Sequence, residues 1–283
     1  MLLLSWLSNP THKRLIAIFV GLGVLGIIIG LFVTMNWSNI TWLGLSRHCQ
    51  GQGMDDYGDA PDGIPTGYPP QPGMIGTFPS SNANNGAHSN VVCDLWMGEK
   101  ITGEADYNDP ADPDPIHLNP NPPGPPPVPN QRSDYDDGIG WVWRPDPNAG
   151  PSQLPTDFIV SVEISSNKVR EDLVANVLMD LDMSGNWNSP GTSGQEWVIR
   201  NYHIPVVQSG HQTVDLPQIR FPTPGMSAST MPPCFWMRVA ITDQPIEAEP
   251  WIGTGQLGQG EIEDYLVHPT PVAGDCRSSQ PVQ

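Results

Sequence analysis

The chain has 283 residues, of which 33 are proline, 29 are glycine and only 15% are charged. This composition excludes long soluble helices and favours turn-rich β-structure. Ten tryptophans and several apolar runs argue for a folded core and against full disorder. With a net charge of −18, the chain repels nucleic acid and anionic lipid headgroups and attracts divalent cations, so no nucleic-acid partner is expected.

The first segment of the chain is apolar and long enough to cross a membrane as a helix. Leu15 to Val33 is a run of nineteen uncharged residues that follows Lys13 and Arg14, so the positive-inside rule places the N-terminus in the cytoplasm. A cleaved signal peptide is the alternative, but no small-x-small cleavage site follows the run. We therefore predict a cytoplasmic segment (1–14), a single-pass transmembrane anchor (15–35) and a tether (36–54), with the rest extracellular or periplasmic.

Four cysteines follow the apolar segment, without the C-x-x-C spacing of a metal site. An even number of cysteines in an exported region predicts two disulfides, and all three possible pairings stay open. A zinc site made of the four thiolates is the alternative, which the wide spacing disfavours. These cysteines are Cys49, Cys93, Cys234 and Cys276.

Two stretches in the first half of the exported region are expected to lack long regular elements. Residues 63–90 are rich in Gly, Pro, Ser and Asn and predict a loop-rich layer, with a short strand at 91–97. Residues 108–130 contain a run of prolines, which predicts an extended, exposed insertion loop because proline cannot donate to a β-ladder.

The second half of the chain carries the pattern of β-strands. Phe158, Val160, Val162 and Ile164 alternate with less apolar residues, the period-2 signature of a half-buried strand. Further strands are predicted at 173–179, 197–204, 213–221, 235–242 and 262–267. Short strands between Pro and Gly turns predict an all-β fold, specifically an antiparallel β-sandwich spanning 55–268, followed by a tail at 269–283.

One loop between predicted strands has the spacing of a calcium-binding loop. Oxygen-bearing side chains recur at every second position from 180 to 186, and Gly185 allows a tight turn. An EF-hand loop would have Glu at its twelfth position, where this chain has Gly191, so a carboxylate from elsewhere must complete the site. The alternative is an Asx-rich turn that binds nothing. The predicted calcium ligands are Asp180, Asp182, Ser184, Asn186 and, as the nearest additional carboxylate, Glu196.

Two acidic segments stand near the two ends of the predicted domain. Residues 55–62 contain four Asp, and residues 261–264 contain three carboxylates in four positions. Like charges so close repel one another unless a positive charge lies among them. Because basic side chains are few, a bound cation is the expected positive charge, and the two segments are expected to meet across the fold.

Seven segments in order carry a resemblance to a known family. They are Asp-Tyr-Gly-Asp-Ala-Pro-Asp at 56–62, Asn-Gly-Ala-His at 85–88, Leu-Trp-Met-Gly at 95–98, Gly-Glu-Ala-Asp at 103–106, Asp-Tyr-Asp-Asp-Gly-Ile at 134–139, the loop at 180–187, and Gly-Glu-Ile-Glu-Asp-Tyr-Leu-Val at 260–267. Residues 55–268 thereby resemble the GEVED domain of bacterial and archaeal surface and secreted proteins. The chain departs from that pattern in lacking an Arg before His88 and in carrying the proline-rich insertion.

The resemblance implies a β-rich extracellular module of the kind found in adhesin-like proteins, without established catalytic activity. It also implies an acidic core, to which the charge argument adds a second-choice metal role. The residues of this acidic core are Asp56, Asp59, Asp62, Asp136, Asp137, Glu261, Glu263 and Asp264.

The expected function is that of a calcium-stabilised structural or adhesive surface module. Its expected partners are the membrane, through the N-terminal helix, and other surface proteins or glycans. A carbohydrate-binding module is the alternative, with Trp141, Trp143, Trp187 or Trp251 stacking on sugar rings. A hydrolase that uses paired carboxylates comes third, because no catalytic motif such as Gly-x-Ser-x-Gly or His-Glu-x-x-His occurs.

Overall fold

The computed structural model describes residues 49, 52–68, 71, 73–98, 100, 101, 103, 106, 138–144, 157–188, 196–205, 207–220 and 234–267. These residues belong to one compact unit, His48–Gln283. Within them, no helix is long and apolar enough to cross a membrane. The predicted cytoplasmic segment, the anchor at 15–35, the insertion loop at 108–130, the tail at 269–283 and most of the tether lie outside the described residues.

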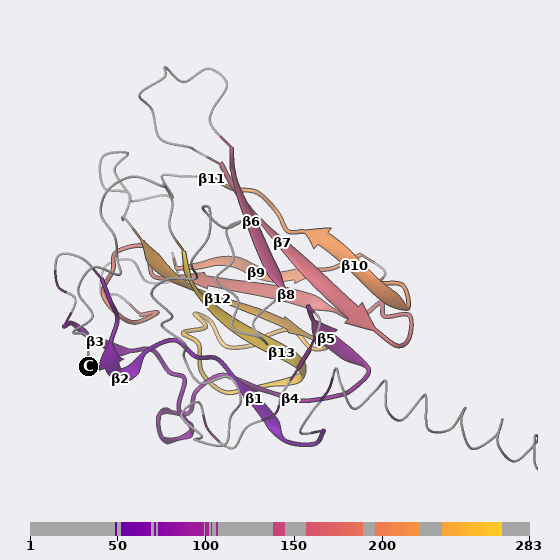
Figure 1. The fold of residues 1–283 in the computed structure, drawn as a ribbon, viewed down its shortest axis with the longest axis horizontal. Helices are drawn as coiled ribbons and strands as arrows, with labels where there is room; N and C mark the ends of the chain where they lie inside the picture. Colours follow the sequence, from indigo (N-terminus) through magenta and orange to yellow (C-terminus); the bar gives the residue numbers. More distant parts are fainter. Residues whose placement is uncertain are drawn as a thin grey trace, which may run out of the picture. The chain divides into compact units, whose positions relative to one another are not determined.

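The described part of the chain is mostly β-strand with almost no helix, which confirms the all-β prediction (Figure 1). Its helical content is the short 3-10 helix η1 (Asn82–Asn84). The strands are β1 (Asp55–Tyr57), β2 (Asp62–Pro65), β3 (Ile75–Thr77), β4 (His88–Asn90), β5 (Leu95–Met97), β6 (Ile139–Arg144), β7 (Asp157–Ser166), β8 (Val174–Met179), β9 (Trp197–His203), β10 (Gly210–Asp215), β11 (Ile219–Arg220), β12 (Phe235–Thr242) and β13 (Gln256–Val267).

The strands form two large open sheets and one separate hairpin. The six-stranded sheet has the order β1-β4-β13-β12-β8-β9, and the five-stranded sheet is centred on β7, which pairs with β5, β6, β10 and β11 (Figure 1). β2 and β3 pair with each other outside both sheets. The pairings between named strands are antiparallel, except that β13 runs parallel to β4. The Ile262 amide of β13 donates to Asp56 (2.6 Å) and the Ala60 amide donates to Asp264 (2.6 Å), so the two acidic segments meet as predicted.

Strand β12 shows how both faces of the six-stranded sheet become buried. Phe235, Met237, Val239 and Ile241 belong to one hydrophobic cluster. Trp236 and Ala240, on the other face, belong to a second cluster. All eight residues of the strand are buried. The period-2 pattern therefore predicts the strand correctly, but neither of its faces meets solvent.

Two apolar clusters hold the layers together. The larger cluster receives residues from β5, β6 and β7 of one sheet and from β8, β9, β12 and β13 of the other, so it is the core between the two sheets. The second cluster lies on the opposite face of the six-stranded sheet and includes Tyr68, Phe78, Ala87 and Trp251 from loops. In the predicted loop layer at 63–90, the described residues contain only short elements, and this layer covers that face.

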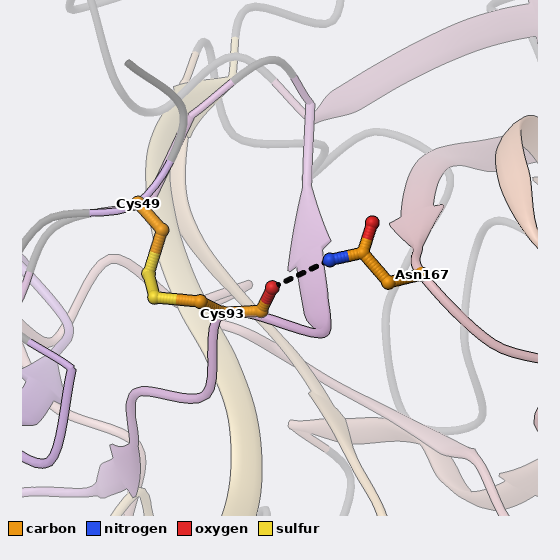
Figure 2. Close-up of a disulfide and its surroundings, with 3 residues drawn as sticks. All are labelled: Cys49, Cys93 and Asn167. Atoms are coloured by element: carbon orange, nitrogen blue, oxygen red, sulfur yellow. Dashed lines mark hydrogen bonds between the residues drawn. A yellow bond between two sulfur atoms is a disulfide. The ribbon is translucent and has the colours of Figure 1, made fainter. Parts of the chain in front are cut away.

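A disulfide fastens the start of the described chain to the segment before β5. Cys49 and Cys93 are bonded, with their Cα atoms 5.5 Å apart, and the Asn167 side chain donates a hydrogen bond to the Cys93 carbonyl (2.8 Å, Figure 2). Cys234 is also disulfide-bonded, and Cys276 lies outside the described residues. The prediction that the cysteines form disulfides is confirmed for the described ones.

Candidate metal centre

The loop that follows β8 is shaped by its backbone and by its partner strands. The Asp180 amide donates to the Trp236 carbonyl of β12 (3.0 Å), which fixes the start of the loop at the end of the sheet. Met183 and Gly185 have positive φ values of 55° and 80°, and they let the chain turn back sharply. At Gly185 this conformation costs little because glycine has no Cβ.

The pairing of β8 with β9 brings Glu196 to the start of this loop. Glu196 directly precedes β9, and its carbonyl accepts a hydrogen bond from the Met179 amide at the end of β8 (2.8 Å). Residues 180 and 196 therefore lie at the same end of two paired strands. This pairing explains how a carboxylate from outside the loop reaches it.

Asp180, Asp182 and Glu196 form a carboxylate group that could hold a metal ion. One oxygen from each side chain lies within 4.8 Å of the others. Asp180 is 0% exposed and Glu196 is 3% exposed, whereas Asp182 is exposed. Among the described residues, no other set of three or more His, Cys, Asp or Glu side chains meets this distance criterion. Three of the five predicted calcium ligands are thus brought together.

The other two predicted ligands, Ser184 and Asn186, make the contacts of an Asx-type turn. The Ser184 amide donates to Oδ1 of Asp180 (2.9 Å) and to Oδ1 of Asp182 (3.0 Å). The Asn186 side-chain oxygen accepts from the Asn188 amide (2.8 Å). These bonds preorganise the loop, and they are the contacts that the alternative prediction of an Asx-rich turn requires.

Tyr68 completes the surroundings of the Asp180 carboxylate from the loop layer. Its hydroxyl donates to Oδ2 of Asp180 (2.8 Å) and accepts from the Trp236 amide (2.8 Å), and the Gly185 amide donates to the same Oδ2 (2.9 Å). The sequence did not indicate Tyr68, because it is a single aromatic residue in a Gly- and Pro-rich stretch without periodicity. Burial, followed by the nearby Asp180 charge, raises the pKa of Tyr68 well above its usual value.

Burial also changes the ionisation of Asp180. Loss of solvent raises the pKa of Asp180 from 3.8 to about 7, and the charge of Asp182 acts in the same direction, against the hydrogen bonds from Tyr68, Gly185 and Ser184. Near neutral pH, Asp180 is therefore partly protonated when no cation is bound. A cation would favour the charged carboxylate, because opposite charge offsets the cost of burial.

The raised pKa of Asp180 predicts how the metal-free protein responds to pH. Its folded pKa of about 7 lies above the ordinary value of 3.8, so the folded state binds more protons between these values. The resulting stability is fully present below about pH 4 and is lost as pH rises through about 7. We expect the unfolding free energy in chelator to fall across this range, with a shallower slope in Asp180→Asn. Urea unfolding at a series of pH values measures both slopes, and equal slopes would contradict the assignment.

The second-choice acid Asp264 has its positive partner within the protein. Arg238 Nε donates to Oδ1 of Asp264 (2.8 Å) and Arg238 Nη2 donates to Oδ2 (2.7 Å), and both side chains are 0% exposed. Arg238 lies directly opposite Asp264 in the β12–β13 register. This pair corrects the expectation that a bound cation neutralises Asp264, and Arg238 is a central residue that the strand pattern did not single out.

Arg238 also connects β12 to the loop layer. Its guanidinium donates to the Pro79 carbonyl (2.9 Å), the Gly253 carbonyl (3.1 Å) and the Ser80 hydroxyl (2.7 Å). The loop approaches so closely that a Cβ at Gly58 would lie 2.6 Å from Arg238 Nη2 and 2.6 Å from Asp264 Oδ2. The pair therefore fixes the loops as well as the two strands.

The other second-choice acids mainly accept hydrogen bonds that join loops and strands. Asp56 accepts from the Ile262 amide (2.6 Å), and Glu261 accepts from the Met97 amide. Asp59 is half-buried, and Asp136 and Asp137 lie outside the described residues. Asp62 accepts hydrogen bonds from the Ser81 amide (3.0 Å) and from the Ser81 hydroxyl (2.6 Å). Glu263 accepts hydrogen bonds from the Gly138 amide (3.2 Å) and from the Tyr265 hydroxyl (2.6 Å). The described members of this set do not form a metal-binding group.

The tryptophans named for sugar stacking are mostly inside the protein. Trp141, Trp187 and Trp251 are buried, so their ring faces cannot receive a sugar. Trp143 is half-buried and packs against Phe158, with ring centroids 4.5 Å apart. These four tryptophans therefore do not provide the exposed ring faces that the carbohydrate-binding alternative expects of them.

One set of side chains superficially matches a hydrolytic triad. Ser165 Oγ lies 3.0 Å from Nδ1 of His211, whose Nε2 lies 3.6 Å from Oε2 of Glu163. However, the buried Ser165 hydroxyl donates its proton to the Gly98 carbonyl (2.9 Å). Because Ser165 is also buried, a substrate could not reach its hydroxyl, so the set does not support the hydrolase alternative.

Within the described residues, the fold and the carboxylate group together define an all-β domain with one candidate metal centre at the edge of a loop layer. Comparison of the chain with models of known protein families, with curated proteins and with solved structures gives no match. The resemblance to the GEVED domain therefore depends on the seven segments quoted above.

Proposed function

We propose that the chain is a single-pass membrane protein that displays a calcium-stabilised, GEVED-like β-sandwich outside the cell membrane or in the periplasm. Its role is structural or adhesive, without catalysis, and its partners are other surface proteins or glycans. The observation that carries the proposal is the group of Asp180, Asp182 and Glu196, whose carboxylate oxygens lie within 4.8 Å of one another.

The chemistry of the group favours calcium over other common metals. All three side chains offer oxygen, which hard cations such as Ca²⁺ prefer, whereas zinc sites use Cys and His. Calcium also tolerates irregular coordination with six to eight ligands, so loop oxygens and water can complete a site built from three carboxylates. Magnesium requires a near-ideal octahedron and keeps most of its water, which fits a loop of this shape less well.

Export of the domain is supported by its chemistry as well as by the predicted anchor. Cys49 and Cys93 form a disulfide, and such bonds persist in oxidising compartments outside the cytoplasm. Extracellular modules bind calcium weakly, with dissociation constants of about 10⁻⁴ to 10⁻³ M. Calcium there would neutralise the buried carboxylates and stabilise the folded state by linkage.

Calorimetric titration of calcium into the full-length chain in a mild detergent tests the proposal. We expect one site with a dissociation constant of about 10⁻⁴ to 10⁻³ M and at least tenfold weaker binding in Glu196→Gln, because this change removes a carboxylate ligand. Glu249→Gln is the matched control, since Glu249 is exposed and pairs with Arg200. Absence of calcium binding, or equal loss in both variants, would contradict the proposal.

A further inference from the structure

The β2–β3 hairpin lies outside both large sheets and touches the candidate calcium loop. The Thr77 amide of β3 donates to the Gly185 carbonyl (2.7 Å). A Cβ at Gly185 would lie 3.3 Å from Thr66 Cγ2 and 3.5 Å from the Gly76 Cα atom. The hairpin and the loop therefore pack backbone against backbone, and a shift of one requires a shift of the other.

Tyr68, in the connection between β2 and β3, reaches the carboxylate at the start of the loop. It is 1% exposed, and its hydroxyl bridges the Trp236 amide and Oδ2 of Asp180, at 2.8 Å from each. The Trp236 indole nitrogen donates in turn to the Thr66 carbonyl (3.1 Å). One end of this chain of hydrogen bonds is the hairpin connection, and the other end is the Asp180 carboxylate.

We propose that docking of the β2–β3 hairpin and ion binding at the Asp180 loop are coupled through Tyr68. Tyr68 acts as a positioning residue, because its hydroxyl holds the Asp180 carboxylate in one orientation toward Asp182 and Glu196. The ion-binding step of this coupling rests on the calcium site proposed above. The docking of the hairpin onto the loop is supported by the contacts of Tyr68, Thr77 and Gly185.

The coupling gives calcium control over a surface segment. The hairpin carries Ile75, a large apolar residue that is 51% exposed, next to the half-buried Met74. An ion that orders the loop would therefore also order this part of the surface. Coupling between two equilibria is reciprocal, so hairpin docking must strengthen ion binding by the same factor by which ion binding strengthens docking.

The test compares Tyr68→Phe with Tyr265→Phe in the full-length chain in a mild detergent. Both changes remove one buried hydroxyl that donates to a carboxylate, because the Tyr265 hydroxyl donates to Glu263 (2.6 Å), away from the hairpin. In Tyr68→Phe we expect the dissociation constant for calcium to rise about 5- to 10-fold. In Tyr265→Phe we expect it to stay unchanged. Calorimetric titration measures both constants.

Hydrogen exchange of peptides from 62–68 and 73–77 supplies the second readout. We expect the wild-type hairpin to exchange faster in chelator than in calcium, and the Tyr68→Phe hairpin to exchange fast in both, while β12 stays protected. If Tyr68→Phe does not fold, the wild-type comparison still decides the question. Calcium binding without any change in hairpin exchange overturns the coupling alone. Absence of calcium binding by the wild type overturns the proposed function, and the coupling with it.

Discussion

Replacing Arg238 with methionine is expected to lower the free energy of unfolding by about 3 to 5 kcal/mol, because it leaves a buried carboxylate without its positive partner. Arg238 and Asp264 are both 0% exposed and make a two-bond contact. The change also leaves the Pro79 and Gly253 carbonyls and the Ser80 hydroxyl without their donor. Loss of the donor to these buried acceptors adds to the cost of the unpaired buried carboxylate.

Chemical denaturation followed by tryptophan fluorescence measures this effect. Arg200→Met is the matched control, because Arg200 is exposed and pairs with the exposed Glu249, and exposed pairs contribute about 0 to 1 kcal/mol. The double variant Arg238→Met with Asp264→Leu should recover part of the loss, since it removes both charges. Equal stability of Arg238→Met and Arg200→Met would mean that the buried pair does not hold the layers together.

Arg238 also shows what strand periodicity cannot predict. The alternation of β12 separates two sets of residues correctly, but the pattern alone does not tell whether the second face meets water or another layer. In this fold the loop layer covers that face, so a charged residue on it becomes fully buried. The scarcity of basic residues in a chain of net charge −18 pointed instead to a bound cation, because composition does not show that Arg238 lies opposite Asp264.

The fold class could be predicted because strands carry local signals. Alternation at 158–164 indicated β7, whose Phe158, Val160, Val162 and Ile164 are all buried. Long-range pairing carries no such signal, so the parallel contact of β13 with β4 and the separate β2–β3 hairpin did not follow from the sequence.

In the candidate site, too, residues close together in the sequence could be predicted, whereas contacts between distant segments could not. Asp180 and Asp182 were indicated by spacing within one loop, and Glu196 by its closeness in the chain to that loop. Pairing of β8 with β9 is what brings Glu196 to the group. Tyr68 is 112 residues away from Asp180 in the sequence. Only the folding of the loop layer over β12 brings the two residues together.

Calcium is expected to raise the melting temperature of the full-length chain by about 5 to 10 °C. An ion at about 100 times its dissociation constant stabilises the folded state by about 2.7 kcal/mol. In a domain of roughly 150 to 250 residues, each kcal/mol corresponds to about 2 to 4 °C. The physical reason is that Asp180 and Glu196 are almost fully buried beside Asp182, so their mutual repulsion is strongest when no cation is present.

Differential scanning calorimetry in a mild detergent, with calcium or with chelator at matched ionic strength, measures the shift. Asp180→Asn should melt at the same temperature in both solutions, because it removes a buried carboxylate from the group. Asp215→Asn is the control: Asp215 is exposed and accepts from the Ser161 hydroxyl (2.6 Å), outside the loop, so this variant should keep the full response. A wild-type melting temperature that is identical in calcium and in chelator would show that the three carboxylates do not form a stabilising calcium site, and the loop would then be an Asx-type turn closed by its own amides.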